Sequence, residues 1–517
     1  MQVDRRNFLK NAGLACVAGG VAIAGAQNAF ASTVLTNNYI QSDEIKAPTG
    51  RAATIVIAAS DSTADEKAQA DLVCDGIADN VEIQAAIDAC ESIGGGKILI
   101  TGHFVGGQLV FRGSNIVLQG QGASTVYTAA DGMNTDIIRV GDGGTIADIH
   151  DFEIRNIQID GNNANQSAGS GILFDANVNH SIISDVKIVY CFEHGIEIVN
   201  PAPSLTTAFN DIINTFVYGC GGDGIRVTHS HGLTLSNIVS NFNTGSGIYL
   251  VQSNSFHLSD VWLNGNLNGL YLYLTNNSFV INLNTASSVD IGIKLIGSGY
   301  TTFVNCVIED TNGSSGMSCV TYSDFVNLYG CFFPYNDYEH LRLSGSHNCN
   351  ITNCIFGSAS QYTNNAVPGV RIMGDSTNNT FSGCTGFDKS VSGKLPTYMF
   401  LESTDGGNSP NNNSYINNKI NPCYNTGLLS LLGANNCIQN NLGYVTENTG
   451  TATITASETT VDVTHGLAAA PTRVILSPTA DTDGKAYWVS AKGASTFTIT
   501  VDSASGGDIS FDWQAVV

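Results

Sequence analysis

The stretch "YGCGGDGIRVTHSHG" places Asp223, Arg226, His229 and His231 within nine consecutive positions. Aspartate and histidine are common proton-transfer groups, and arginine pairs with carboxylates or sulfates. An active site and one turn of a repetitive scaffold both account for such a stretch. The spacing of similar stretches along the chain therefore has to be considered next.

A Gly-apolar-x-apolar phrase recurs between residues 150 and 390. Its glycines are 22 to 24 residues apart, with one interval of 29: Gly171, Gly195, Gly224, Gly247, Gly269, Gly292 and Gly316. A second column keeps the same period: Asn156, Asp185, Asn214, Asn237, Asp260, Asn282, Asn305, Gly330, Asn353 and Gly383. Two phases at one period indicate one structural coil per repeat. Short β-branched runs leave no room for a helix in each repeat, so we predict a parallel β-helix with about three strands per coil.

Alternation within "GIRV" points Ile225 and Val227 inward and Arg226 outward. The same count in every coil gives one outward column: Leu173, Glu197, Arg226, Tyr249, Tyr271, Lys294, Ser318, Arg342 and Arg371. Neighbouring coils lie about 4.8 Å apart, so these residues become neighbours. The apolar position after the Asn column is filled later in the chain by Cys306, Cys331, Cys354 and Cys384, which we expect inside the coils.

The outward column is rich in basic and aromatic side chains, which suits a groove for an acidic polysaccharide. The predicted substrate-binding residues are Arg226, His229, Tyr249, Tyr271, Lys294 and Arg342. Glu197, Asp223 and His194 are the candidate catalytic residues, because a lyase needs a base and a hydrolase needs two carboxylates. A solvated strand face of mixed polar residues is the structural alternative.

The net charge of −23 disfavours nucleic acid as a partner. None of the 13 cysteines forms a CxxC pair of the zinc-binding type, so no metal site is predicted. The sequence indicates no cofactor, and no cluster of aspartates marks a calcium site.

The N-terminus reads as an export signal. Paired arginines in "DRRNFLK" precede an apolar run and then "AFAS", a pattern that resembles the twin-arginine motif. Cleavage after Ala31 makes residues 1–31 the signal and 32–51 a linker. We therefore expect a secreted or cell-surface protein without a membrane span once the signal is removed.

Residues 70–100 contain one convincing helix. Asp79 and Glu82 have the spacing of a capping box, and Ile83, Ile87 and Cys90 form an apolar stripe. Such a helix covers the open edge of a first coil. A disulfide between Cys74 and Cys90 remains open.

This segment resembles the entry segment of the pectate-lyase-like right-handed parallel β-helix superfamily. The matching residues are Asp75, Gly76, Asp79, Ile83, Gln84, Ala86, Ile87 and Asp88. The resemblance implies an all-β, right-handed parallel β-helix (pectin-lyase-like) with residues 52–100 as its N-terminal cap and 101–445 as its coils. It leaves activity open, because the superfamily holds lyases, hydrolases, epimerases, viral spikes and non-catalytic proteins.

Residues 446–517 alternate as four to six strands and predict a small β-sandwich. This segment is similar to terminal modules of tail-fibre-like and surface proteins, and we interpret His465 as a turn histidine rather than a ligand. The chain lacks the Asp-Asp and Gly-His-Gly signatures of polygalacturonase-type hydrolases and the Asp-Pro-His-Glu motif of alginate epimerases. We expect an exported protein that binds an acidic polysaccharide, with lyase or hydrolase processing left open. The alternative is a non-catalytic surface or spike protein, assembled as a homotrimer.

Overall fold

The computed structural model describes residues 54–142, 148–200, 207–359, 367–387, 397–420 and 429–517. The predicted signal and linker lie outside these residues. Within the described ranges, helices long and apolar enough to cross a membrane are absent.

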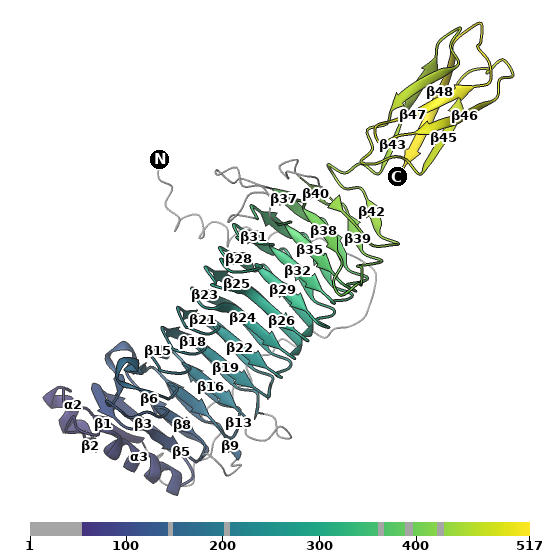
Figure 1. Ribbon diagram of the computed structural model, residues 1–517. Helices are drawn as coiled ribbons and strands as arrows, with labels where there is room; N and C mark the ends of the chain where they lie inside the picture. The colour runs from purple at the N-terminus through teal and green to yellow at the C-terminus, as the bar shows by residue number, and fades with distance from the viewer. Residues whose placement is uncertain (1–53, 143–147, 201–206, 360–366, 388–396, 421–428) are drawn as a thin grey trace, which may run out of the picture. The chain divides into compact units, whose positions relative to one another are not determined.

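One face of the coils is a 13-stranded parallel sheet (Figure 1). Each of its strands pairs with the strand that the next coil contributes to the same sheet. Its members are β5 (Leu109–Phe111), β8 (Ile138–Val140), β12 (Ile172–Phe174), β16 (Ile196–Val199), β19 (Ile225–Thr228), β22 (Ile248–Val251), β24 (Asn268–Tyr273), β26 (Ile291–Ile296), β29 (Met317–Val320), β32 (Leu341–Ser344), β35 (Val370–Met373), β38 (Phe400–Ser403) and β41 (Leu429–Ser430).

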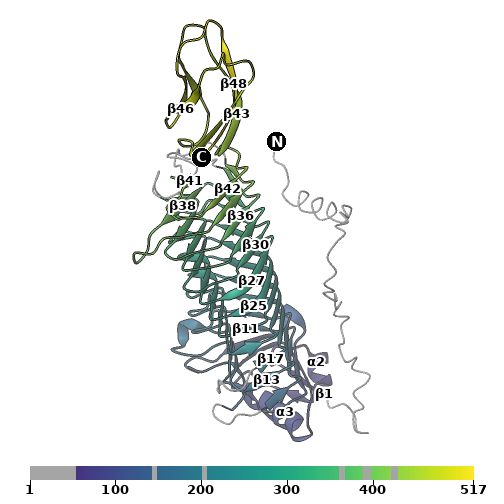
Figure 2. The same ribbon diagram turned by 90° about the vertical axis from the view of Figure 1, so that its right-hand side faces the viewer.

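The rest of each coil belongs to a 25-stranded parallel sheet, whose strands from β11 to β42 follow one another in Figure 2. Its members are β1 (Thr54–Ala58), β2 (Leu72–Val73), β3 (Gly96–Thr101), β4 (His103–Gly106), β6 (Ile116–Gln119), β7 (Val126–Ala129), β10 (Glu153–Arg155), β11 (Gln158–Asp160), β14 (Ile182–Ser184), β15 (Lys187–Val189), β18 (Asp211–Tyr218), β21 (Thr234–Asn241), β23 (His257–Asn264), β25 (Asn276–Ala286), β27 (Gly299–Val304), β28 (Val307–Glu309), β30 (Asn327–Tyr329), β31 (Phe332–Pro334), β33 (Asn350–Thr352), β34 (Ile355–Gly357), β36 (Thr380–Ser382), β37 (Thr385–Phe387), β39 (Ser414–Ile416), β40 (Lys419–Ile420) and β42 (Cys437–Gln439). Two short parallel pairs, β9 (Asp148–His150) with β13 (Asn177–Asn179) and β17 (Thr207–Ala208) with β20 (Ser230–His231), complete the coils.

The Asn column marks a bend within the 25-stranded sheet. Asn214 and Asn237 have φ of 50° and 53°, and the other members of the column are also left-handed. Asn and Asp tolerate this conformation better than most residues with a side chain. Their side chains also bond from coil to coil: the Asn237 amide donates to Asn214 at 2.9 Å, and the Asn214 amide donates to Asp185 at 3.1 Å. The column therefore fixes both the bend and the stacking.

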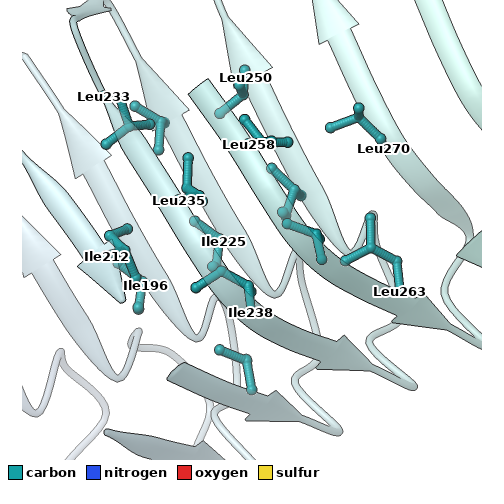
Figure 3. Packing of buried hydrophobic residues seen from close by; sticks show 14 of the residues in the cluster. Ile196, Ile212, Ile225, Leu233, Leu235, Ile238, Leu250, Leu258, Leu263 and Leu270 are labelled. Atoms are coloured by element: carbon teal, nitrogen blue, oxygen red, sulfur yellow. The ribbon is translucent and has the colours of Figure 1, made fainter. Parts of the chain in front are cut away.

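The core lies between the two sheets and is built from inward side chains of successive coils. Figure 3 shows Ile196, Ile225, Leu250 and Leu270 of the 13-stranded sheet packed with residues such as Leu235 of the 25-stranded sheet. Repetition of the same position buries a continuous apolar column, and burial drives the stacking. The four cysteines predicted to lie inside are all fully buried: Cys306, Cys331, Cys354 and Cys384.

The glycines of the repeated phrase are required by close approach of neighbouring coils. A Cβ placed on Gly224 would lie 1.9 Å from the Ser240 hydroxyl oxygen and 2.7 Å from the carbonyl oxygen of Gly247. The Gly247 position is similarly crowded, with the carbonyl oxygen of Gly269 at 2.9 Å. These positions accept no larger residue without displacement of a neighbouring coil.

Helix α3 (Asn80–Ser92) covers the first coils with its apolar side. Ile83, Ile87 and Cys90 are buried, as predicted. The predicted capping box is wrong: Asp79 makes no side-chain cap. Its carboxylate instead accepts from the backbone N–H groups of Gly76 and Val105, at 2.8 and 2.9 Å, because strand β4 passes beside it.

The second helix, α2 (Ala64–Gln69), carries a genuine capping box formed by Thr63 and Glu66. Cys74 and Cys90 are buried free thiols, so the disulfide that the sequence left open is absent from this structure.

The C-terminal residues form two three-stranded antiparallel sheets. One holds β43 (Glu447–Ile454), β45 (Arg473–Pro478) and β48 (Ile509–Val516), and the other holds β44 (Thr460–Thr464), β46 (Tyr487–Lys492) and β47 (Thr496–Val501). Side chains of both sheets share one apolar cluster, as in the predicted sandwich. His465 is fully buried there and accepts the N–H of Leu467 at 3.0 Å, which supports a structural role.

Candidate functional site: a basic and aromatic column with an acidic cluster

The register of the 13-stranded sheet aligns one outward residue from each strand, and we call this set the outer column. It comprises Val110, Arg139, Leu173, Glu197, Arg226, Tyr249, Tyr271, Lys294, Ser318, Arg342, Arg371, Leu401 and Ser430. The nine residues predicted to be neighbours are therefore placed in one row. Five of the chain's 21 Lys and Arg residues stand in this row.

An acidic cluster forms where three predicted catalytic residues meet. The His194 imidazole lies between two carboxylates, with Nε2 3.9 Å from Glu197 Oε1 and Nδ1 3.6 Å from Asp223 Oδ2. The guanidinium of Arg226 lies 3.8 Å from the same Asp223 oxygen. Two carboxylates, one imidazole and one guanidinium are thus gathered on two adjacent coils.

From Asp136 to Ser246, the position three residues before the outward residue forms a hydrogen-bonded ladder. The side chain in one coil accepts the backbone N–H of the equivalent residue in the next coil. The Ser170 hydroxyl accepts from His194 at 3.3 Å, His194 Nδ1 accepts from Asp223 at 2.8 Å, and Asp223 Oδ1 accepts from Ser246 at 2.7 Å. Since Nδ1 is an acceptor, the proton of the neutral imidazole lies on Nε2.

Asp136 begins the same ladder, because its carboxylate accepts the Ser170 N–H at 2.9 Å. Burial raises the pKa of Asp136, although the hydrogen bond from Ser170 opposes the rise. The Ser170 hydroxyl also donates to Glu197 at 3.2 Å. Neither Asp136 nor Ser170 was predicted. The one signal in the sequence was their position, three residues before an outward residue. The Gly-apolar-x-apolar phrase does not include that position.

Beyond the acidic cluster, four outer-column residues stack on one another. The rings of Tyr249 and Tyr271 are 4.4 Å apart and within 8° of parallel. Arg226 lies over the Tyr249 ring at 5.5 Å and Lys294 over the Tyr271 ring at 5.0 Å. Burial raises the pKa of Tyr271 to about 12, and Tyr249 adds to the rise. The two rings thus cover each other and the two cations lie over their outer faces, which leaves the tyrosine edges and hydroxyl groups for a ligand.

Farther along the column, Arg342 and Arg371 share one buried carboxylate. We call these two arginines the arginine pair. Glu339 is 1% exposed and accepts from Arg342 at 2.9 Å and from Arg371 at 2.5 Å. Burial raises the pKa of Glu339, but the two guanidiniums outweigh this effect and hold the pKa below its ordinary range. Glu339 was not predicted, although it precedes Arg342 by the same three residues that separate Asp223 from Arg226.

The structure thus brings some of the predicted site residues into contact and leaves others apart. Glu197, His194, Asp223 and Arg226 touch one another, and the stack continues from them to Lys294. Arg342 lies five coils beyond Arg226, at about 24 Å for a 4.8 Å spacing. His229 occupies the left-handed turn that follows β19, with φ of 56°. Among the described residues, groups of three His, Cys, Asp or Glu side chains able to hold a metal are absent.

Comparison with known proteins bears on the fold. A family model described as the right handed beta helix region matches residues 204–333. The Azotobacter vinelandii mannuronan C-5 epimerase AlgE6 A-module is similar in structure, with a TM-score of 0.53 and 20% identity over 71% of this chain and 96% of that one. The tailspike protein gp49 from Pseudomonas phage LKA1 has a TM-score of 0.54 and 13% identity, covering 84% and 92%.

An N-terminal fragment of bacteriophage Phi29 gene product 12 has a TM-score of 0.55 and 16% identity over 70% of this chain and 68% of that one. No curated protein matches the sequence. The chain is therefore a right-handed parallel β-helix protein, as the entry segment and the period predicted.

Proposed function

We propose that this protein binds an acidic polysaccharide along the outer column. The observation that carries the proposal is the continuous stack of Arg226, Tyr249, Tyr271 and Lys294 on four consecutive strands. In a chain of net charge −23, a row with five basic residues offers positive charge to an anionic polymer. The likeness of fold to a mannuronan C-5 epimerase module is compatible with such a ligand.

Because the tyrosine faces are occupied, the bound polymer contacts their edges and hydroxyl groups. The phenol oxygens supply hydrogen bonds to sugar hydroxyls. The cations at the two ends of the stack supply charge-assisted bonds to carboxylates or sulfates. Both cations are also held by a carboxylate of the protein, Arg226 by Asp223 at 3.8 Å and Lys294 by Asp290 at 3.8 Å. These long pairings leave donors for the ligand.

The proposal assigns any chemistry on the bound polymer to the acidic cluster. A neutral His194 with its proton on Nε2 faces Glu197, and Asp223 lies on the other side of the ring. Such a set supplies a base, an acid and, through Arg226, a charge to neutralise a uronate. A glycan screen with product analysis tests this assignment: unsaturated uronate ends indicate a lyase, and new reducing ends without them indicate a hydrolase.

The binding experiment compares two variants. The Tyr249→Ala/Tyr271→Ala/Lys294→Ala variant is expected to weaken binding to polygalacturonate or dextran sulfate at least tenfold. Its control is Tyr300→Ala/Phe325→Ala, which removes another nearly parallel aromatic pair, 4.7 Å apart, from β27 and from the turn before β30. Equal binding by both variants and the wild type would contradict the proposal.

A second candidate is a non-catalytic spike or cell-surface protein that assembles as a homotrimer. The fold likeness to a phage tailspike with 84% of this chain covered favours it, as does a terminal sandwich. Light scattering during size-exclusion chromatography tests it directly. A trimer mass without product formation in the glycan screen favours the spike, and a monomer mass counts against it. Under either candidate we propose export to the cell surface or beyond.

A further inference from the structure

A polar cleft lies on the same coils as the arginine pair. It is formed by the turns that follow β29, β32, β35 and β38, and its lining residues are Thr321, Tyr322, Ser344, Gly345, Gly374, Asp375, Asp405, Gly406 and Asn408. Four successive coils contribute to it, so the stacking that builds the outer column also builds the cleft. None of these lining residues was predicted from the sequence to act in binding.

The cleft has the side chains that a sugar needs. Tyr322 is 72% exposed and presents an aromatic surface, in contrast to the mutually covered rings of Tyr249 and Tyr271. Asp375, Asp405 and the neighbouring amide and hydroxyl groups offer acceptors and donors to hydroxyls. The two carboxylates disfavour an anionic group inside the cleft itself.

The arginine pair stands beside the cleft and carries an excess of positive charge. Two guanidiniums share the single carboxylate of Glu339, which leaves one positive charge unmatched within this group of three side chains. Arg342 precedes Gly345, a lining residue, by three positions, or roughly 10 Å of strand. Both guanidiniums remain partly exposed, with 30% and 23% of their side chains accessible.

Burial of the shared carboxylate makes the pair a fixed charge rather than a flexible one. Glu339 also lies within 3.5 Å of the Ser315 hydroxyl, which donates to it. The Nε atom of Arg342 is buried and has no hydrogen-bond partner among the described residues. A guanidinium held in this way pays little further conformational entropy when it binds an anion.

We propose that the cleft and the arginine pair together form an anchoring subsite for a saccharide that carries one carboxylate or sulfate group. The hydroxyl-bearing part of the saccharide lies in the cleft against Tyr322, and its anionic group meets Arg342 and Arg371. This subsite rests on the proposed function and deepens it, because it lies about 24 Å along the same face from the acidic cluster. A polymer held there is anchored away from the residues assigned to chemistry.

The test uses the full-length protein and three probes in isothermal calorimetry: polygalacturonate, dextran sulfate and unmodified dextran. Arg371→Gln is expected to weaken binding of the anionic probes about tenfold and to leave dextran unaffected. Glu339→Gln is expected to strengthen binding of the anionic probes, because it removes the charge that offsets the pair. A merely structural role for these residues would weaken binding in both variants. Thermal unfolding of each variant verifies that the coils remain folded.

Tyr322→Ala tests the cleft, with Tyr335→Ala as the matched control, since Tyr335 is also exposed and follows a strand of the 25-stranded sheet. We expect at least a threefold loss for the former and no change for the latter.

The outcomes separate the subsite from the stack. If the anionic probes bind all these variants as tightly as the wild type, while the Tyr249→Ala/Tyr271→Ala/Lys294→Ala variant loses binding, the anchoring subsite alone is overturned. A loss only in the cleft and pair variants supports the subsite and contradicts the stack. A wild type that binds no probe overturns both. Preference for polygalacturonate or for dextran sulfate identifies the anionic group.

Discussion

The backbone N–H of Asp223 donates to the imidazole Nδ1 of His194 across one coil, at 2.8 Å. This bond is one step of the ladder that joins successive coils. It also sets the tautomer of the ring and directs Nε2 toward Glu197, 3.9 Å away. A residue of the scaffold and a candidate catalytic group are therefore the same side chain, and substitution must separate the two roles.

His194→Ala leaves the Asp223 N–H without its acceptor. We expect the free energy of unfolding to fall by about 1–2 kcal/mol, the usual cost of an unsatisfied, partly buried donor. His194→Asn places a carbonyl oxygen near the former Nδ1 and is expected to lose less. Urea unfolding measures both, and equal stability of the Ala variant and the wild type would refute the structural role. If Nε2 transfers a proton, both variants lose product formation alike.

Gly224→Ala tests the close packing of coils. The added Cβ meets Ser240 Oγ at 1.9 Å and a backbone oxygen at 2.7 Å, so neighbouring coils must separate. We expect a destabilisation of about 1–3 kcal/mol, typical of overpacking. Gly506→Ala is the control, because its Cβ meets nothing within 4 Å. Thermal melts of the two variants should differ by several degrees, and coincident melts would show that the coils adjust freely.

Asn237 separates backbone conformation from hydrogen bonding. Its φ is 53°, and its amide donates to Asn214 at 2.9 Å. Asn237→Ala loses the bond and places alanine in a left-handed conformation, for a combined cost of about 2 kcal/mol. Asn237→Gly loses the bond but adopts the conformation readily, so its cost is nearer 1 kcal/mol. Chemical denaturation that ranked Gly below Ala would reject this division.

His340 predicts a dependence of stability on pH. It is fully buried between Phe333 and Phe356, and burial lowers its pKa from the ordinary 6.5 to about 3. The unfolded chain therefore binds a proton that the folded chain refuses, and stability falls as the pH drops from 6.5 toward 3. His340→Gln removes this loss, because glutamine does not titrate in this range. Unfolding midpoints at pH 7 and pH 4 should lie closer together in the variant, and an unchanged gap would be evidence against the assignment.

The sequence predicted the fold well because stacking repeats a local pattern. Ile225, Val227 and their equivalents recur at one period, and inward and outward faces follow from alternation alone. The same reasoning placed Tyr249 beside Tyr271. It failed at Asp79, whose carboxylate bonds Gly76 and Val105 instead of capping a helix, since that choice depends on where a distant strand passes.

Side-chain partners were the harder part of the site. Alternation shows that Tyr249 and Tyr271 face outward, but not that their rings cover each other, which depends on side-chain rotamers and on the flanking cations. Glu339 and Asp136 hold the same position as His194 and Asp223, three residues before an outward residue, but the partners of their carboxylates depend on the side chains of neighbouring coils. The cleft by Tyr322 was missed for a related reason: it is formed by turns from four coils, and each turn alone is unremarkable in composition.

The ladder from Ser170 through His194 and Asp223 runs in one direction, with each coil offering acceptors that only a following coil can fill. A single coil does not determine how many coils the molecule has, so the number of coils is set by the segments that begin and end the stack. A chain cut cleanly in the middle would present an open row of oxygens and nitrogens to any matching surface. Copies of such a fragment should join end to end into fibres, which α3 prevents at the first coils of the intact molecule.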